Sequence, residues 1–278
     1  QQQSSSFVRD ASTRSRHAFG APSRTPTLQT AKTHHLLKEH VHLPSVQRLR
    51  GGGCDDSNPA LFFKIGISAI LESALMLGVI FASFKLSEMY PSIPSVFNLP
   101  LLELISSFAV IFASSLFGSI VDGGLNVASN QVLSPDVVPG NPDWYAKLVK
   151  PSWNPPGWLF PIMWLIVSKP TQLCAVSRIL KFGVSKLEGD STATFPIGIL
   201  AVYCSHLALG DAWNKVFFGL QCTGRGAAVI TVFFGLLLAS TYLFYTVDNL
   251  AGYYMLPTCG WVAVATALNW NIYSNNKD

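Results

Sequence analysis

The side chains of this chain best suited to hold a ligand are its tryptophans, because a flat indole stacks on flat apolar rings. All seven fall between positions 144 and 270: Trp144, Trp153, Trp158, Trp164, Trp213, Trp261 and Trp270. Other chemistry is scarce, since His206 is the only histidine beyond residue 50 and no Cys/His spacing suits zinc. Paired carboxylates and an activated nucleophile are also missing from the sequence pattern, which argues against hydrolytic or metal-dependent catalysis.

The tryptophans divide by their position in the apolar segments. Three lie near predicted segment ends, where an interfacial aromatic belt explains them: Trp144, Trp153 and Trp270. Three others lie well inside apolar segments: Trp164, Trp213 and Trp261. In a dry medium an indole N–H needs a hydrogen-bond partner, so the belt explains the interior tryptophans poorly.

Two aromatic stripes recur at helical spacing and should each occupy one helix face. The first is Tyr203, His206, Gly210, Trp213 and Phe217. The second is Tyr254, Pro257, Trp261, Val264 and Leu268. A packed core is one interpretation of such stripes. Close helix packing in lipid favours small residues, however, so two bulky faces also predict a space that a flat apolar ligand fills.

The elements that position these stripes are apolar segments long enough to cross a bilayer. Hydrophobic residues make up 49% of the 278 residues and charged residues only 12%. Six segments qualify: Leu61 to Met89, Leu104 to Val121, Trp158 to Ile179, Phe195 to Phe218, Gly226 to Val247, and Asn249 to Asn276. The pattern predicts an all-α, polytopic membrane helix bundle in a lipid bilayer. Glu72, in the first segment, should face protein rather than lipid.

The basic charge belongs to the N-terminal tail. Residues 1–50 hold eight Lys/Arg against Asp10 and Glu39, a net +6, which leaves −2 for the rest of a chain whose total is +4. Nucleic-acid binding therefore loses its support. A tail rich in Ser, Thr and Arg without an apolar run is typical of an organellar transit peptide, here for a plastid membrane or alternatively a mitochondrial one. A plain disordered basic tail remains the other interpretation.

The five cysteines carry no paired motif. We expect them to be small apolar residues inside helices, without a disulfide framework.

The most specific stretch runs from Trp144 to Trp164. It reads WYAKLVKPSWNPPGWLFPIMW, with Asn154 placed to cap a helix that begins at the paired prolines. This stretch resembles the loop-to-helix segment that marks the TspO/MBR family. Further matches follow in order: Trp213, Val216-Phe217-Phe218-Gly219, Ala251-Gly252, Pro257, Trp261 and Leu268-Asn269. The resemblance covers about residues 106 to 276.

The resemblance implies a five-helix core over residues 96–278, often dimeric, preceded here by an extra apolar helix in 56–95 and a tail in 1–55. Members of the family bind porphyrins, cholesterol in animals and synthetic benzodiazepine-type ligands, so a tetrapyrrole (a porphyrin or haem), or alternatively a sterol, is the expected ligand, with no obligatory cofactor. The implied role is that of a carrier, scavenger or sensor. A light-dependent porphyrin-degrading enzyme and a structural protein without a pocket are the alternatives. The residues carried over as ligand-binding are Trp144, Trp153, Asn154, Trp158, Phe160, Trp164, Trp213, Phe217, Trp261 and Asn269.

The chain departs from the family pattern at several positions. Lys169-Pro170 should interrupt a helix that is otherwise continuous, and Gly210 replaces an asparagine. Asp211 is an added acid at membrane depth. Because His206 stands alone, a bound haem would receive at most one axial nitrogen from the residues beyond the tail.

Overall fold

A computed structural model describes Cys54 and residues 59–133, 142–187 and 196–277. The chain divides into two units, Gln1–Val46 and Gln47–Asp278, and all described residues belong to the second. The expected transit peptide lies outside the described residues. Its role and its boundary therefore stay predictions.

The described part is helical apart from one short hairpin, which confirms the predicted fold class. Its elements are α1 Pro59–Met89, β1 Ser95–Val96, β2 Leu99–Pro100, α2 Leu101–Phe112, α3 Ser114–Leu133, α4 Pro142–Lys147, α5 Leu159–Pro161, η1 Ile162–Ser168, α6 Lys169–Leu187, α7 Ile197–Asn214, η2 Lys215–Gly219, α8 Thr223–Val247 and α9 Asn249–Asn275. The two segments labelled η are π-helical turns. Strands β1 and β2 pair antiparallel, with Val96 opposite Leu99.

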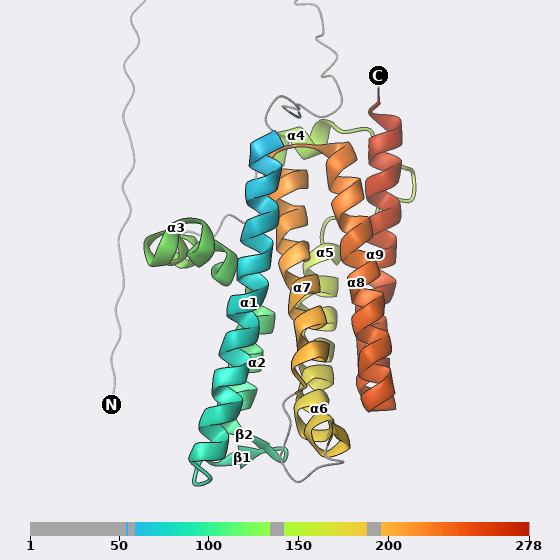
Figure 1. Cartoon of the computed structure of the whole chain (residues 1–278). Helices are drawn as coiled ribbons and strands as arrows, with labels where there is room; N and C mark the ends of the chain where they lie inside the picture. The colour runs from blue at the N-terminus through green and yellow to red at the C-terminus, as the bar shows by residue number, and fades with distance from the viewer. Residues whose placement is uncertain (1–53, 55–58, 134–141, 188–195, 278) are drawn as a thin grey trace, which may run out of the picture. The chain divides into compact units, whose positions relative to one another are not determined.

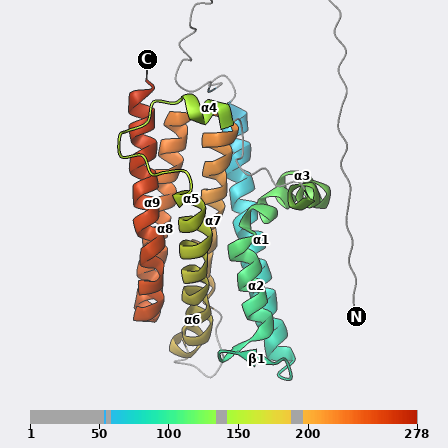
Figure 2. The same cartoon turned by 180° about the vertical axis from the view of Figure 1, so that it is seen from behind.

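The long helices lie side by side along one direction (Figure 1). Helix α4 crosses one end of this bundle, and the β1–β2 hairpin lies at the other end. Helix α6 packs mainly on α9 and also on α2 and α8, and α2 lies against α1, as the view from behind shows (Figure 2). Short links make α7, α8 and α9 sequential neighbours, as expected.

Three helical runs among the described residues are long and apolar enough to cross a membrane: Pro59–Met89, Leu159–Phe182 and Thr223–Val247. Helices α7 and α9 were also expected as spans, and they form at the predicted positions. They do not reach the same apolar character, because polar residues such as His206 and Asn269 line their buried sides.

The second predicted span, Leu104 to Val121, is not one straight helix. Leu101–Phe112 and Ser114–Gly123 are bent by 72° at Ala113, and together they would make a fourth, broken span. The break leaves nearby backbone carbonyls without the N–H donors that a continuous helix would provide. The Lys169 ammonium group donates to these carbonyls instead. Its Nζ donates to the carbonyl oxygens of Ile111 at 2.5 Å and Phe112 at 3.4 Å. A buried backbone carbonyl needs such a partner.

We predict that Lys169→Met lowers the free energy of unfolding by about 1–3 kcal/mol, the usual cost of an unsatisfied buried polar group. Chemical unfolding of the full chain in detergent, followed by loss of helicity, measures this change. Lys181→Met is the matched control, since Lys181 is exposed on the same helix α6. Equal loss in both variants would contradict the bridging role of Lys169.

The expected interruption at Lys169-Pro170 is wrong. The helix runs from Leu159 through Pro170 to Leu187, with the wider π-turn at Ile162–Ser168 immediately before the proline. Proline lacks the N–H that an α-helix would use there, so a carbonyl one turn earlier loses its donor. The Thr171 hydroxyl donates to the carbonyls of Val167 at 2.9 Å and Ser168 at 3.0 Å, which helps the helix to continue.

The expected helix cap at Asn154 is also wrong. The helix begins at Leu159, three residues after the paired prolines, and no side chain caps it. The Asn154 amide instead donates to the adjacent carbonyl of Pro155 at 3.2 Å.

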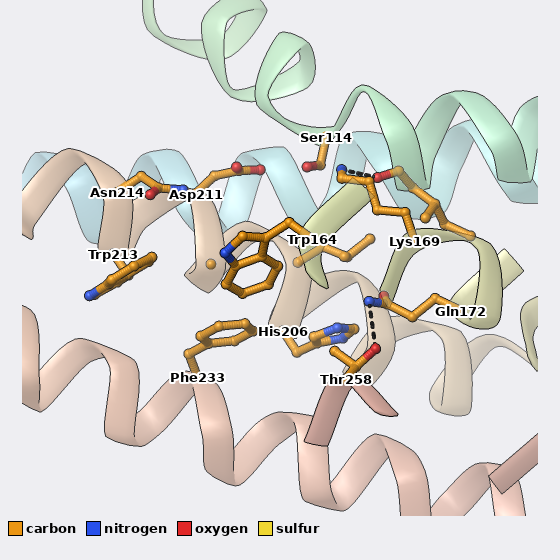
Figure 3. Close-up of a pocket in the computed structure, with 13 residues that line it drawn as sticks. Ser114, Trp164, Lys169, Gln172, His206, Asp211, Trp213, Asn214, Phe233 and Thr258 are labelled. Atoms are coloured by element: carbon orange, nitrogen blue, oxygen red, sulfur yellow. Dashed lines mark hydrogen bonds between the residues drawn. The ribbon is translucent and has the colours of Figure 1, made fainter. Parts of the chain in front are cut away.

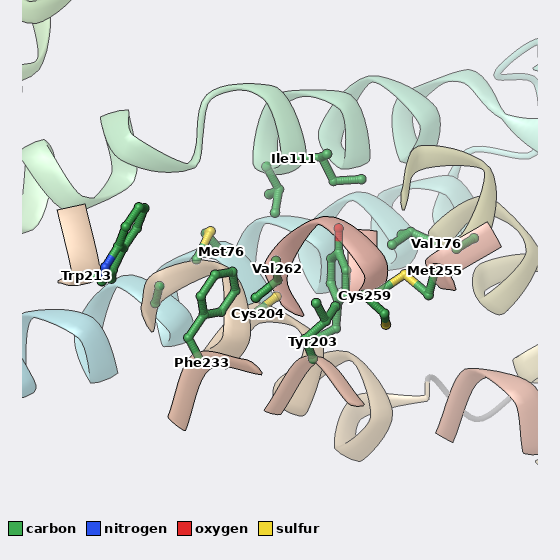
Figure 4. Close-up of a cluster of buried hydrophobic side chains, with 14 of the residues drawn as sticks. Met76, Ile111, Val176, Tyr203, Cys204, Trp213, Phe233, Met255, Cys259 and Val262 are labelled. Atoms are coloured by element: carbon green, nitrogen blue, oxygen red, sulfur yellow. The ribbon is translucent and has the colours of Figure 1, made fainter. Parts of the chain in front are cut away.

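One apolar core joins the helices, and it includes the extra N-terminal helix. Figure 4 shows Met76 of α1 beside core side chains of α7 and α8, among them Cys204 and Phe233. Met76 and Ile80 of α1 are fully buried. Glu72, on the same buried side of α1, is 0% exposed, which confirms the prediction that it faces protein.

The expectation that the cysteines form no disulfide is wrong for one pair. Cys54, before α1, is bonded to Cys222, which lies between α7 and α8 and 168 residues further along the chain. A pair so distant in sequence has no spacing motif, and only the packing of α1 on α7 brings the two together. Cys174, Cys204 and Cys259 are free thiols, as expected.

We predict that the denatured, unreduced chain exposes three thiols, and that reduction raises the number to the full five. Intact-protein mass after alkylation, with and without reductant, counts them. Five labelled thiols in the unreduced sample would contradict the disulfide.

Candidate ligand-binding site

A cavity of about 210 Å³ lies inside the bundle, where α2, α6, α7, α8 and α9 meet. Its walls are mostly apolar with a few convergent polar groups: Ile111, Ser114, Trp164, Lys169, Gln172, His206, Leu207, Gly210, Asp211, Trp213, Asn214, Phe233 and Thr258. Figure 3 shows the rings of Trp164, Trp213, His206 and Phe233 around it. This composition, apolar rings with a few fixed polar groups, is typical of small-molecule sites.

A smaller gap of about 20 Å³ adjoins the aromatic side of the cavity. The two spaces share Trp164 and Trp213 as lining residues. The gap's other walls include Phe160, Phe217 and Asn269. The indole Nε1 of Trp213 donates to Oδ1 of Asn269 at 3.0 Å, so this interior tryptophan has the partner that a dry site requires.

Helix α7 and the π-turn η2 that follows it present the first predicted stripe to the interior. Tyr203, His206, Trp213 and Phe217 are all buried, which confirms that they share a face. Gly210 lines the cavity beside them, and a Cβ there would be in ordinary van der Waals contact with the Phe233 ring at 3.4 Å.

The second predicted stripe, on α9, lies only partly on the buried face, where Trp261 and Leu268 are found. Tyr254 and Val264 are exposed, while the residues one position further along, including Met255, Thr258 and Ala265, are buried. Trp261 still reaches inward from the edge of that face. Its ring lies 5.2 Å from Phe160 and 6.4 Å from Trp164, centroid to centroid.

The polar groups of the cavity differ in their hydrogen bonding: Gln172 is bonded to two other helices, whereas His206 and Asp211 each keep an atom without a partner among the described residues. Gln172 links two helices, because its Nε2 donates to Thr258 at 3.3 Å while its Oε1 accepts from the Tyr203 hydroxyl at 2.9 Å. His206 is 1% exposed, and its Nδ1 has no hydrogen-bond partner among the described residues. Asp211 likewise has one carboxyl oxygen, Oδ2, without a donor in the described structure.

The loop before α5 is fixed to the end of α9. The Asn276 side chain accepts from the Val149 amide at 3.0 Å and donates to the Val149 carbonyl at 2.9 Å. Lys150, whose pKa burial lowers, lies 4.6 Å above the Tyr145 ring. These contacts hold the loop over the aromatic end of the bundle.

Seven of the ten sequence-predicted residues come together in one aromatic cluster. They are Trp144, Phe160, Trp164, Trp213, Phe217, Trp261 and Asn269. The three others lie in the loop: Trp153 is 47% exposed, Trp158 is 66% exposed, and the Asn154 side chain donates to the carbonyl of Pro155. Only Trp164 and Trp213 of the ten line the cavity of about 210 Å³.

Sequence reasoning missed several cavity residues as ligand contacts. They are Lys169, Gln172, His206, Asp211, Phe233 and Thr258. Polar residues inside apolar segments were the available signal for five of these six, since each needs a protein partner or a water-filled space at membrane depth. Phe233 gave no such signal in a uniformly apolar helix.

Comparisons with known proteins agree with this geometry. A family profile described as the TspO/MBR family matches residues 115–274. The "Tryptophan-rich sensory protein" of Cereibacter sphaeroides is 33% identical over 147 residues, 53% of this chain and 82% of that protein. The human "Translocator protein" is 33% identical over 135 residues, 48% of this chain and 75% of that protein. The "Tryptophan-rich protein TspO" of Chlorobaculum tepidum is 32% identical over 133 residues, 48% and 79% respectively.

Proposed function

Because the chain belongs to the TspO/MBR family, we propose that it binds a tetrapyrrole, a porphyrin or haem, within the membrane and serves as its carrier, scavenger or sensor. The names of its relatives, a sensory protein and a translocator protein, support a sensing or translocating role in the membrane. The observation that carries the tetrapyrrole proposal is the cavity lined by the indoles of Trp164 and Trp213. Indole faces provide the stacking surface that a flat macrocycle needs.

The cavity must enlarge to take such a ligand. Its volume of about 210 Å³ is below the roughly 300–1,000 Å³ of typical ligand pockets. The adjoining gap of about 20 Å³ shares Trp164 and Trp213 with it, so rotation of these two side chains would merge the two spaces. We therefore propose that the ligand displaces the aromatic cluster and stacks on its rings.

His206 gives the cavity a means to distinguish haem from a metal-free porphyrin. It lines the cavity, and its Nδ1 has no partner among the described residues. A neutral imidazole nitrogen in this position is a suitable axial ligand for haem iron. We propose one axial contact from His206, with stacking supplying the rest of the binding energy.

The test is an absorption titration of the purified full chain in lipid nanodiscs with protoporphyrin IX and with haem. The proposal expects the main absorption band of each to shift at a saturable stoichiometry and to keep its intensity. In His206→Ala the haem spectrum should lose the signature of iron ligation by histidine, whereas the protoporphyrin IX shift, which involves no iron, should be unchanged. No saturable shift with either compound would contradict the proposal and favour a structural protein without a pocket.

The same titration, repeated under illumination, distinguishes a protein that only binds porphyrin from an enzyme that degrades it in the light. A binder leaves the porphyrin absorption intact under illumination, whereas an enzyme bleaches it in proportion to the light dose. Free porphyrin in empty nanodiscs, illuminated in parallel, corrects for spontaneous bleaching.

We also propose that the protein resides in a plastid membrane, with a mitochondrial membrane as the alternative, and that it acts as a homodimer. The Ser-, Thr- and Arg-rich composition of residues 1–50 supports the organellar address. A reporter fused to this tail should enter plastids on import. Its delivery to the secretory pathway would contradict the address.

A further inference from the structure

Glu72 of α1 is a fully buried acid in the part of the chain before the family match begins. It is 0% exposed, and neither of its carboxyl oxygens has a hydrogen-bond donor among the described residues. It packs closely on α3, where a Cβ at Gly118 would lie 2.6 Å from Glu72 Oε2. An isolated carboxylate in such a place is costly, so its environment must supply a counter-charge or a proton.

A second acid, Asp211, lies beside Glu72. The carboxyl groups of Glu72 and Asp211 lie within hydrogen-bonding reach of each other. Asp211 is on α7, lines the cavity, and has Oδ2 without a donor in the described structure. An ionised carboxylate only accepts hydrogen bonds, so two adjacent carboxyl groups can bond to each other only when one carries a proton.

The neighbouring charges are already engaged elsewhere. Lys215 of η2 pairs with Asp122 of α3 at 2.7 Å, and the Ser68 hydroxyl of α1 donates to the same Asp122 at 2.6 Å. Lys169 of α6 donates to the Ile111 carbonyl. These two cations favour negative charge on Asp211 from a distance, but within the described part of the chain neither forms an ion pair or a hydrogen bond with it.

The positive charge of Lys64, which lies one turn before Ser68 on α1, stabilises the carboxylate of Asp122. It has no such effect on the carboxylate of Asp211. The carboxyl pair thus has no cation of its own among the described residues. A proton is the remaining way to balance it.

We propose that Glu72 and Asp211 form a proton-binding site, in which the two carboxyl groups share one proton at the wall of the cavity and ligand occupancy changes that protonation. Protons reach this site from outside the bundle by way of Asp122 and Lys215. The side chains of these two residues are 37% and 32% exposed and lie next to the pair. The extra helix α1 thereby adds an ionisable group to the family bundle. The link to occupancy rests on the proposed function, whereas the shared proton does not.

The test of the shared proton is infrared spectroscopy of the ligand-free full chain in nanodiscs. A carboxylic acid C=O band should be present at neutral pH and should shift in D2O. Glu72→Gln and Asp211→Asn should each abolish it, because the new amide donates to the remaining carboxylate and replaces the proton. Glu88→Gln, an exposed acid on the same helix, should leave the band unchanged. Glu103, another buried acid, is assigned separately with Glu103→Gln.

Absence of the band in the parent chain, or its survival in both pair variants, would overturn the proposal. Helicity and thermal unfolding confirm that each variant is folded, and the parent spectrum decides the question even where a variant is not.

The link to occupancy is measured as proton uptake or release when protoporphyrin IX is added in weak buffer. A saturable absorption shift without any proton exchange would overturn the link alone. Failure of protoporphyrin IX to bind would overturn the proposed function and leave the shared proton to the infrared result.

Discussion

Trp213→Ala is expected to weaken protoporphyrin IX binding by about two powers of ten. The lost indole removes stacking worth on the order of 1 kcal/mol beyond area burial. It also removes roughly 2–3 kcal/mol of apolar contact if the site does not collapse. At ~1.4 kcal/mol per decade, this sum corresponds to a 100-fold or greater change in Kd. Absorption titrations of parent and variant in nanodiscs measure it.

Trp270 is the matched control for this change. It lies on α9 near the end of the bundle, is 45% exposed, and donates from its indole nitrogen to Thr231 at 3.0 Å. Trp270→Ala removes the same group without touching the cavity, so Kd should change less than threefold. Trp261→Ala should have an intermediate effect, because Trp261 contacts Trp164 but does not itself line the cavity. An equal loss of affinity for protoporphyrin IX in Trp213→Ala and Trp270→Ala would contradict the assignment of the cavity as the binding site.

Gly252→Ala is expected to lower the stability of the bundle by about 1–3 kcal/mol, the usual cost of overpacking. Gly252 is in the first turn of α9, against α8. A Cβ there would lie 2.5 Å from the Tyr245 Cβ and 2.8 Å from its Cα, and backbone cannot move aside as a flexible side chain could. The turn is held further by Asp248, which accepts from the Ala251 amide at 2.9 Å and pairs with Arg178.

Gly260→Ala on the same helix is the control, because a Cβ at Gly260 would meet nothing within 4 Å. Alanine in an open helical position is expected to be neutral or to stabilise by about 0.5–1 kcal/mol. Thermal unfolding of both variants in detergent, followed by helicity, makes the comparison. A Gly252→Ala chain as stable as Gly260→Ala would contradict the close approach of α8 and α9.

Periodicity and segment length were sufficient to predict the long helices other than the broken α2–α3 run, and the orientation of two of them. The stripe on α7 and the inward side of Glu72 follow from spacing and from the cost of charge in lipid. The same spacing predicted an α9 stripe of which Trp261 and Leu268 are buried but Tyr254 and Val264 are exposed. Hydrophobic pattern therefore predicts a helix better than it predicts the face that the helix buries.

Features that depend on contacts between distant segments could not be predicted. The break at Ala113 is sustained by Lys169 from another helix, and the Cys54–Cys222 bond depends on how α1 packs on α7. Asn154 shows the converse, since a residue type that often caps helices lies here in a loop before the helix begins. The cavity is lined by tryptophans that the family motif indicated and by polar residues. The positions of these polar residues follow only from the packing of the helices.

Quenching of intrinsic tryptophan fluorescence by bound protoporphyrin IX tests the central claim most directly. The parent chain should show saturable quenching with the same Kd as the absorption titration. The double variant Trp164→Phe, Trp213→Phe lacks both cavity indoles but keeps the five others, and its remaining emission should be quenched far less at equal occupancy. Undiminished quenching in the double variant would place the ligand beside other tryptophans and contradict the cavity as the binding site.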